Sequence, residues 1–197
     1  MDPVAFEIGP VSIRWYGICA AVGFLGAFAL IQYRAPGYGV KRETSADLGF
    51  VGVVGALVGA RLLYVIQNWA SFRADLLDIV RIDHGGLVFY GGLAGGAGLI
   101  IALCRVRHLS ILTVGDVFAP AVALGHGIGR IGCLLNGCCF GKPWNGPLAI
   151  QYPAHSHVAA VQQLQGHISP EVVQPLPVFP VQAVASAGNF FICGVLL

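Results

Sequence analysis

Long apolar runs make up most of this chain, and they limit the folds it can adopt more than any other feature. A helix needs about 20 residues to cross the hydrocarbon core of a bilayer. Inside lipid, only helices and closed barrels satisfy every backbone polar group. The chain is therefore predicted to be an all-α, polytopic integral membrane protein. Its single membrane domain, residues 1–197, is predicted to hold about five transmembrane helices, near 13–33, 47–66, 86–104, 111–135 and 181–197, with a loop over 136–180.

The composition supports a membrane protein and argues against one class of partner. Hydrophobic residues make up 56% of the sequence and charged residues only 10%, whereas soluble domains carry about 25% charged residues. The net charge is only +2 and the sequence contains no long basic run, so no nucleic-acid partner is expected. The last apolar run has no polar flank before residue 197, which indicates a C-terminally truncated chain.

The loop charges predict an orientation. Loop 34–46 carries three basic residues and one glutamate, and loop 105–110 carries two arginines and no acidic residue. Loop 67–85 has two basic residues against three aspartates. Because basic loops stay in the cytoplasm, the N-terminus, loop 67–85 and loop 136–180 are predicted to lie on the outer side.

Clustered glycines predict two kinds of backbone arrangement. Gly52, Gly55 and Gly59 follow the three- to four-residue spacing that lets helices pack closely in lipid. The pairs Gly85–Gly86 and Gly91–Gly92 are denser than packing requires. They are predicted to break or bend the outer end of the third span, where irregular backbone is tolerated if it lines a cavity.

The stretch from Gly125 to Lys142 carries the strongest functional signal. It places an arginine, several glycines, an asparagine and three cysteines at the end of an apolar run. A cation near hydrocarbon is unfavourable unless it meets a partner, so by default it marks a site. Arg130 in this stretch and Arg61 in the second span can each bind a phosphate in a two-pronged manner. Alternatively, each pairs with Asp47, Asp116 or backbone carbonyls and only holds helices together.

Three of the six cysteines, Cys133, Cys138 and Cys139, lie close together in the sequence. Their C-x4-C-C spacing matches no standard zinc or haem pattern, and neither a metal nor a cofactor is expected. One interpretation is a disulfide from Cys133 to one of the other two, or unreactive thiols. The other is a chemically active thiol, favoured by the charge of Lys142.

Several segments of the chain form an ordered set of motifs. In sequence order they are Ile8–Val11 with Arg14–Gly17, Gly59–Arg61 with Tyr64 and Asn68, Gly85–Leu93, Asp116–Pro120, Gly129–Gly141 and Pro177–Gln182. This set resembles the prolipoprotein diacylglyceryl transferase family along nearly the whole chain. The resemblance implies a multi-pass protein of the bacterial inner membrane. It also implies transfer of diacylglycerol from phosphatidylglycerol to the cysteine thiol of a prolipoprotein signal sequence, so the expected partners are these two substrates and membrane lipid.

The family reaction assigns expected roles to particular residues. Arg130 and Arg61 are expected to hold the phosphate, and the groups expected to add hydrogen bonds or shape the pocket are Tyr16, Tyr90, Asn136 and Gly137. His126 lies four residues before Arg130, on the same helix face, and is the best candidate for the base that takes the thiol proton. For His126 the alternative is a hydrogen bond between helices, for Asn136 and Gly137 a helix-end cap, and for Tyr16 an anchor at the membrane interface.

Three positions depart from the family pattern. Tyr90 stands where the glycine-rich motif usually has a histidine, Cys133 where the signature usually has an asparagine, and Cys138 where it usually has a glutamate. A phenol is a poor base at neutral pH but a good hydrogen-bond donor. Two alternatives to the family reaction follow. One is a catalytically inactive relative that binds anionic lipid or a lipoprotein, and the other is a related lipid transfer that uses Cys138 or Cys139 as nucleophile.

Overall fold

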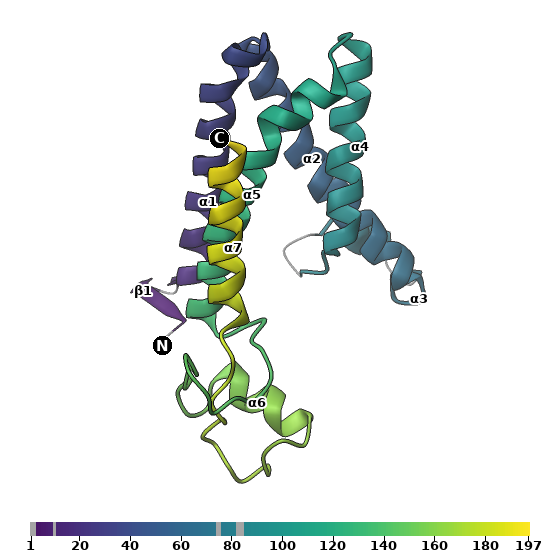
Figure 1. The fold of residues 1–197 in the computed structure, drawn as a ribbon. Coiled ribbons are helices and arrows are strands. Elements are labelled where there is room, and N and C mark those ends of the chain that lie inside the picture. Colours follow the sequence, from purple (N-terminus) through teal and green to yellow (C-terminus); the bar gives the residue numbers. More distant parts are fainter. Residues whose placement is uncertain (1–2, 10, 74–75, 82–84) are drawn as a thin grey trace. The chain divides into compact units, whose positions relative to one another are not determined.

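The computed structural model of this chain is mostly helical (Figure 1). It describes residues 3–9, 11–73, 76–81 and 85–197. The long helices are α1 (Trp15–Arg34), α2 (Arg42–Gln67), α4 (Phe89–Val106) and α5 (Ile111–Asn136), and the shorter apolar helix α7 (Val181–Leu196) follows. Within the described residues, four helices are long and apolar enough to cross a membrane. The predicted class, a polytopic helical membrane protein, is confirmed.

A short hairpin precedes these helices, and short helices lie between them. Strands β1 (Val4–Ile8) and β2 (Val11–Arg14) form an antiparallel hairpin, with Glu7 opposite Ser12. The remaining short helices are η1 (Ala35–Tyr38), α3 (Trp69–Phe72), η2 (Leu76–Ile79) and α6 (His157–Leu164). The sequence did not predict the hairpin, because strands of four and five residues give too short an alternation to stand out beside a long apolar run.

The chain divides into two compact units, which are described separately. The first unit contains residues 1–30 and 118–197, and the second contains residues 31–117. Helices α1 and α5 each run from one unit into the other. The sequence-based orientation remains a prediction, and two of its aspartates, Asp75 and Asp83, lie outside the described residues.

In the second unit, α2 and α4 approach each other backbone to backbone. A Cβ added at Gly59 would overlap the carbonyl oxygen of Gly91, and a Cβ added at Gly95 would overlap that of Gly55. Small residues permit this contact in lipid, where dispersion rather than the hydrophobic effect holds helices together. The predicted break at Gly91–Gly92 is wrong, because both glycines lie inside α4 and their missing side chains make room for α2.

In the first unit, α5 is packed between α1 and α7 through its own glycines. A Cβ at Gly23 of α1 would lie 2.9 Å from the carbonyl oxygen of Gly125. From α7, Ser186 Oγ donates to the carbonyl of Gly127 at 2.8 Å, and the ring of Phe190 covers the same glycine. Two glycines of the Gly125–Lys142 stretch are therefore contact points between helices.

A proline in α5 accounts for a polar contact made by α1. Pro120 lies within α5 and is fully buried. It has no N–H to donate to the carbonyl four residues earlier, which belongs to Asp116. The Arg34 guanidinium at the end of α1 donates to that carbonyl at 3.5 Å. Arg34 therefore donates to a carbonyl that has no hydrogen-bond donor from its own helix at position 120.

The segment between α5 and α7 has a small core of its own. Tyr152, Val158 and Val178 are buried together, and Phe140 and Ile150 pack against them. Ile150 and Val178 exchange two backbone hydrogen bonds of 3.0 Å. Helix α6 begins after Ser156, whose hydroxyl accepts from the N–H of Ala159, as an N-cap residue does. The segment predicted as a loop over 136–180 therefore contains ordered structure.

A matched pair of substitutions on α4 tests the packing of α2 against α4. Gly95→Ala is expected to lower the free energy of unfolding by about 1–3 kcal/mol, because the new methyl group meets the backbone of Gly55. Gly98→Ala is expected to be neutral or stabilising by up to about 1 kcal/mol, because no described atom lies within 4 Å of a Cβ there. Denaturant unfolding in detergent micelles measures both, and equal effects would contradict this packing.

Candidate functional site

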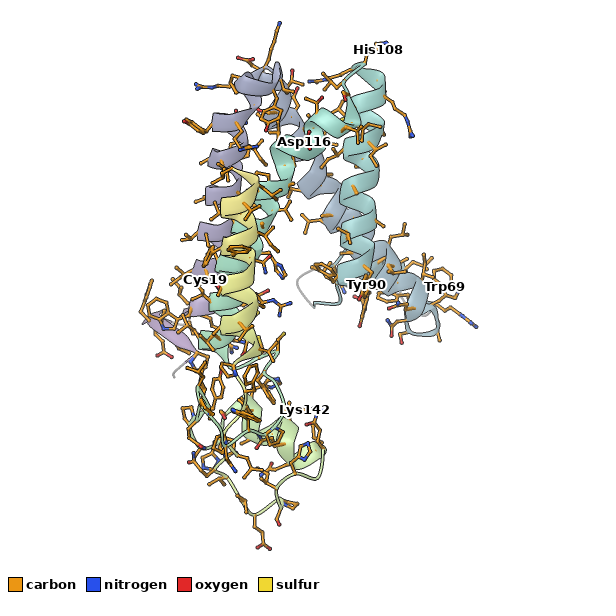
Figure 2. The ribbon with its side chains drawn as sticks, in the orientation of Figure 1. Cys19, Trp69, Tyr90, His108, Asp116 and Lys142 are labelled. Atoms are coloured by element: carbon orange, nitrogen blue, oxygen red, sulfur yellow. The ribbon has the colours of Figure 1, made fainter. Side chains whose placement is uncertain are left out.

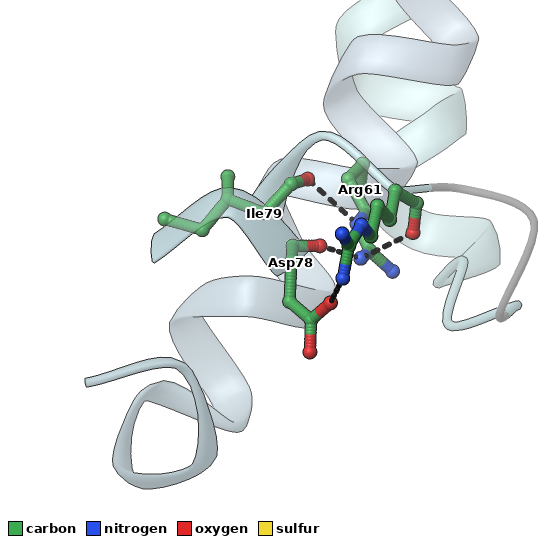
Figure 3. A network of polar contacts seen from close by, with 4 residues as sticks. Arg61, Asp78 and Ile79 are labelled. Carbon is green, nitrogen blue, oxygen red and sulfur yellow. Dashed lines mark hydrogen bonds and ion pairs between the residues drawn. The ribbon is translucent and has the colours of Figure 1, made fainter. Parts of the chain in front are cut away.

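An arginine with several polar contacts lies at the candidate site of each unit. In the second unit, Arg61 of α2 is buried, with 8% of its surface exposed. Its five N–H groups match five hydrogen bonds to backbone carbonyls. Figure 3 shows the bonds to Ile79 and Asp78 among them. Nε donates to Ile79 at 2.9 Å, and Nη1 donates to Gly85 at 2.6 Å and Gly86 at 3.2 Å. Nη2 donates to Asp78 and, at 2.7 Å, to Arg81.

Aromatic rings and glycines complete the surroundings of Arg61. The Arg61 guanidinium lies 5.6 Å from the ring centroid of Tyr64 and 5.3 Å from that of Phe72, within the range of cation–π attraction. Gly85 and Gly86 have φ of +78° and +77°, a region that glycine adopts readily. A Cβ at Gly86 would also overlap the ring of Tyr64. This glycine pair therefore allows the segment before α4 to turn its carbonyls toward Arg61.

These contacts favour the alternative in which Arg61 holds the protein together through backbone carbonyls. Asp47, considered above as a partner for an arginine inside a span, instead forms a 2.6 Å ion pair with Arg107. Tyr90 lies in the first turn of α4 (Figure 2), is 74% exposed and packs edge-on against Phe89. The roles of Arg61 and Tyr90 in substrate binding or catalysis stay predictions.

In the first unit, Arg130 is the end of a hydrogen-bonded chain of three side chains. Its Nε donates to Nε2 of His126 at 3.1 Å, and Nδ1 of His126 lies 3.2 Å from Oδ1 of Asn189 on α7. The amide Nδ2 of Asn189 donates to the carbonyl of Ala185 at 2.7 Å. The i, i+4 spacing brings the histidine and the arginine together on α5, and α7 supplies the asparagine.

The chemistry of the donors selects the tautomer of His126 in this arrangement. An arginine Nε can only donate, so Nε2 of His126 is the acceptor and carries no proton. The ring proton is therefore on Nδ1, which donates to Oδ1 of Asn189. The Asn189 amide is oriented consistently, because its nitrogen already donates to Ala185. Both ring nitrogens of His126 are therefore engaged, and the ring holds the Arg130 guanidinium in one orientation.

Arg130 differs from Arg61 in how many of its donors are occupied. In the part of the chain that the structure describes, its terminal nitrogens Nη1 and Nη2 make no hydrogen bond, and the residue is half-buried. Tyr16 of α1 lies beside α5 at Gly132, two residues after Arg130. A Cβ added at Gly132 would be 3.3 Å from the Cα of Tyr16. The Tyr16 side chain is 48% exposed. A partly buried guanidinium with two open nitrogens is suited to a two-pronged bond with an anion.

Asn136 and Gly137 end α5 in a Schellman cap. The N–H of Cys138 donates to the carbonyl of Cys133 at 3.1 Å, and the N–H of Gly137 donates to that of Leu134 at 3.3 Å. These are the paired bonds of this motif, and Gly137 has the required left-handed φ of +69°. The structure therefore gives these two residues the helix-end geometry, which also turns the chain back over the last turn of α5.

Two buried side chains fix the chain on either side of the cap. Tyr152 donates its hydroxyl to the carbonyl of Leu134 at 2.9 Å, and burial raises the pKa of this phenol above its ordinary value, which keeps the donor protonated. Gln182, fully buried at the start of α7, donates to the carbonyl of Cys138 at 2.8 Å. Sequence reasoning assigned no role to Tyr152, Gln182 or Asn189. The available signal was the polar character of Gln182 and Asn189 within the last apolar run.

Comparison of the sequence with known proteins identifies the family of this chain. A family model described as prolipoprotein diacylglyceryl transferase matches residues 3–197. The chain belongs to this family. Proteins of Staphylococcus aureus strains JH9 and JH1, both named phosphatidylglycerol–prolipoprotein diacylglyceryl transferase, are each 39% identical to it over 145 residues. That alignment covers 73% of this chain and 51% of each relative, so the chain spans about half the length of these curated relatives.

Family membership confirms the resemblance found in the sequence. Of the three positions that depart from the family pattern, Cys133 and Cys138 meet at the end of α5 in the first unit, and Tyr90 is in the second unit. Lys142 lies in the segment that follows α5 (Figure 2). The sequence-based site roles of all these residues remain predictions.

Replacing Arg61 by lysine separates its two possible roles. Arg61→Lys is expected to destabilise the protein by roughly 2–4 kcal/mol, because an ammonium offers three donors and leaves buried carbonyls unpaired. Arg105→Lys, at an exposed arginine in the last turn of α4, is the matched control and is expected to change stability by less than about 0.5 kcal/mol. Unfolding in micelles and binding of phosphatidylglycerol are measured side by side. Unchanged stability with lost lipid binding would instead assign Arg61 to the phosphate.

Proposed function

We propose that this protein transfers a diacylglyceryl group from phosphatidylglycerol to the cysteine thiol of a prolipoprotein signal sequence. Family membership supports the reaction class, and the names of the Staphylococcus aureus relatives state the two substrates. The observation that carries the proposal is the arrangement of Arg130. Its guanidinium is held by His126 and has two terminal nitrogens with no hydrogen-bond partner among the described residues. This is the geometry needed to receive a phosphate.

In the proposed reaction, the thiolate of the acceptor cysteine attacks the glycerol carbon that carries the phosphate. A carbon–sulfur bond forms, the carbon–oxygen bond to the phosphate breaks, and glycerol phosphate leaves with the electron pair. Arg130 binds the phosphate and stabilises the charge that builds up on it as the bond breaks. Tyr16 and Asn136 of the same unit add hydrogen bonds to the lipid head group. In the second unit, Arg61 holds the segment that leads into α4, and the role of Tyr90 stays the one predicted from the sequence.

The role proposed for His126 follows from its contacts. Its Nε2 lone pair accepts from Arg130, so taking a proton from the substrate would require that bond to break. We therefore propose His126 as a positioning residue that aims the guanidinium, with Asn189 fixing its tautomer. The role of general base, inferred from sequence, is the competing prediction. The thiol proton can leave to solvent, since a cysteine with a pKa of about 8.5 ionises in part near neutral pH.

The setting proposed for the reaction is the bacterial inner membrane. Loops 34–46 and 105–110 lie in the cytoplasm in this proposal, and the N-terminus and segment 136–180 lie outside, as the loop charges favour. The C-terminal end of α5 would then face the outer side. Phosphatidylglycerol enters sideways from the bilayer and the signal sequence enters from the same membrane.

A second candidate function is anionic-lipid or lipoprotein binding without transfer. It is favoured because both ring nitrogens of His126 are engaged in hydrogen bonds and because Tyr90 stands where the family pattern usually has a histidine. A third candidate, transfer through Cys138 or Cys139, is favoured by the exposure of the Cys139 thiol. In both candidates Arg130 binds an anionic group, as in the leading proposal. The second predicts no transfer product, and the third predicts an adduct on the protein itself.

The transfer reaction is tested with purified protein in phosphatidylglycerol vesicles and a peptide that contains a lipoprotein signal cysteine. Mass spectrometry is expected to detect a diacylglyceryl thioether on that cysteine. Arg130→Ala is expected to lower the rate by about 100-fold or more, because two charge-assisted hydrogen bonds to phosphate are lost. Lipid binding with no thioether would support the inactive relative. An adduct on the protein itself, lost after alkylation of its thiols, would support the cysteine nucleophile.

A glutamine at position 126 separates positioning from base catalysis. The amide oxygen of His126→Gln can accept from Arg130 Nε but cannot take a proton at neutral pH. If His126 positions Arg130, this variant is expected to stay within about 10-fold of the wild-type rate, with an unchanged pH profile, while His126→Ala loses much more. Equal loss in both variants would identify His126 as the base and contradict the positioning role.

A further inference from the structure

The three clustered cysteines meet in space at the end of α5. The Sγ atoms of Cys133, Cys138 and Cys139 all lie within 4.8 Å of one another, and all three are free thiols. Cys133 and Cys138 are half-buried, and Cys139 is exposed. The proposed transfer reaction needs only the thiol of its substrate, so it does not account for this cluster.

The backbone explains why these thiols gather. In a Schellman cap the residue four positions before the left-handed glycine and the residue directly after that glycine are brought into contact. Around Gly137 these two residues are Cys133 and Cys138. An apolar pair usually occupies these two positions. Cys139 has a left-handed φ of +57°, which is uncommon for a residue with a side chain. This second turn of the backbone brings the third thiol to the same place.

We propose that Cys133, Cys138 and Cys139 form a binding site for a soft cation of the zinc class. Thiolate sulfur is a preferred ligand of such ions. Zn–S bonds of about 2.3 Å in a tetrahedron place the sulfurs about 3.8 Å apart. Closing the present separations of at most 4.8 Å requires movements of about 1 Å, within the reach of side-chain rotation. Three protein ligands leave a fourth position for water or an added ligand.

Charge and access also suit a cation. Three thiolates around a divalent ion carry a net charge of −1, and Arg130 lies three residues before Cys133 on the same helix face, where its positive charge favours that anion. The exposed Cys139 gives an entry route from solvent. Binding releases the three thiol protons to the buffer, so affinity increases with pH. The sequence spacing is not a standard zinc pattern because the helix cap, rather than a short loop between paired cysteines, brings the ligands together.

A titration of the reduced protein with Co²⁺ in micelles tests this site. The expected result is one Co²⁺ per chain, a sulfur-to-cobalt charge-transfer band in the near ultraviolet, and loss of that band when Zn²⁺ is added. Serine in place of each of Cys133, Cys138 and Cys139 is expected to weaken binding by about 10-fold or more and to reduce the band. Cys139→Ser is the most informative variant, because an exposed side chain can be changed without affecting the fold.

Cysteines elsewhere in the chain provide the control. Cys104→Ala and Cys193→Ala remove buried thiols of α4 and α7 and are expected to leave the Co²⁺ band unchanged. Absence of the band in the reduced wild-type protein, or its persistence in Cys139→Ser, would overturn the proposal. A disulfide among the three cysteines, found in membranes whose thiols were blocked at lysis, would also overturn it for the protein in the cell. These readouts do not depend on transferase activity.

Discussion

The rest of this structure depends on one constraint, which is that a polar group carried into an apolar span must find its partner within the protein. Arg61 meets it with five backbone carbonyls of the segments around η2 and before α4. Arg34 meets it at the carbonyl of Asp116, which Pro120 leaves without a helical donor. Ser186 donates across a helix contact to Gly127. Each of these contacts joins segments that the apolar surfaces alone would not hold in register.

The two arginines of the spans meet this constraint in different ways. The difference supports the proposal that Arg61 has a structural role and that Arg130 binds the phosphate. All five N–H groups of Arg61 donate to backbone carbonyls, so this side chain ties the segments before α4 to α2. Among the described residues Arg130 donates only through Nε, and the His126 ring that accepts from it is itself held by Asn189. The Arg130 guanidinium is held at Nε, while Nη1 and Nη2 have no hydrogen-bond partner among the described residues. A guanidinium in this arrangement is preorganised to bind an anionic group. Preorganisation matters because no ordering of the side chain is needed when the anion arrives.

The end of α5 shows how a local backbone motif can bring reactive side chains together. Gly137 allows the Schellman cap, and the cap places Cys138 over Cys133. Tyr152 and Gln182 then donate to carbonyls on either side of the cap, which ties it to the small core of the following segment and to α7. Two positions where the chain departs from its family, Cys133 and Cys138, are thus neighbours at one helix end. Cys133 lies three residues after Arg130 in α5, on the same helix face.

The sequence by itself determined the membrane class, the long apolar helices and the family, because each follows from local composition or from motifs that are continuous in the chain. It also indicated Arg61, His126 and Arg130 as polar residues that need partners. Only the tertiary structure decided what those partners are, since Asn189 lies 63 residues from His126 and the carbonyls that Arg61 meets lie 17 to 25 residues away. The pairs Gly91–Gly92 and Gly85–Gly86 look alike in sequence, yet one packs helices and the other forms a turn. Hydrogen bonding and close packing depend on which distant segments meet, and a linear pattern does not contain that information.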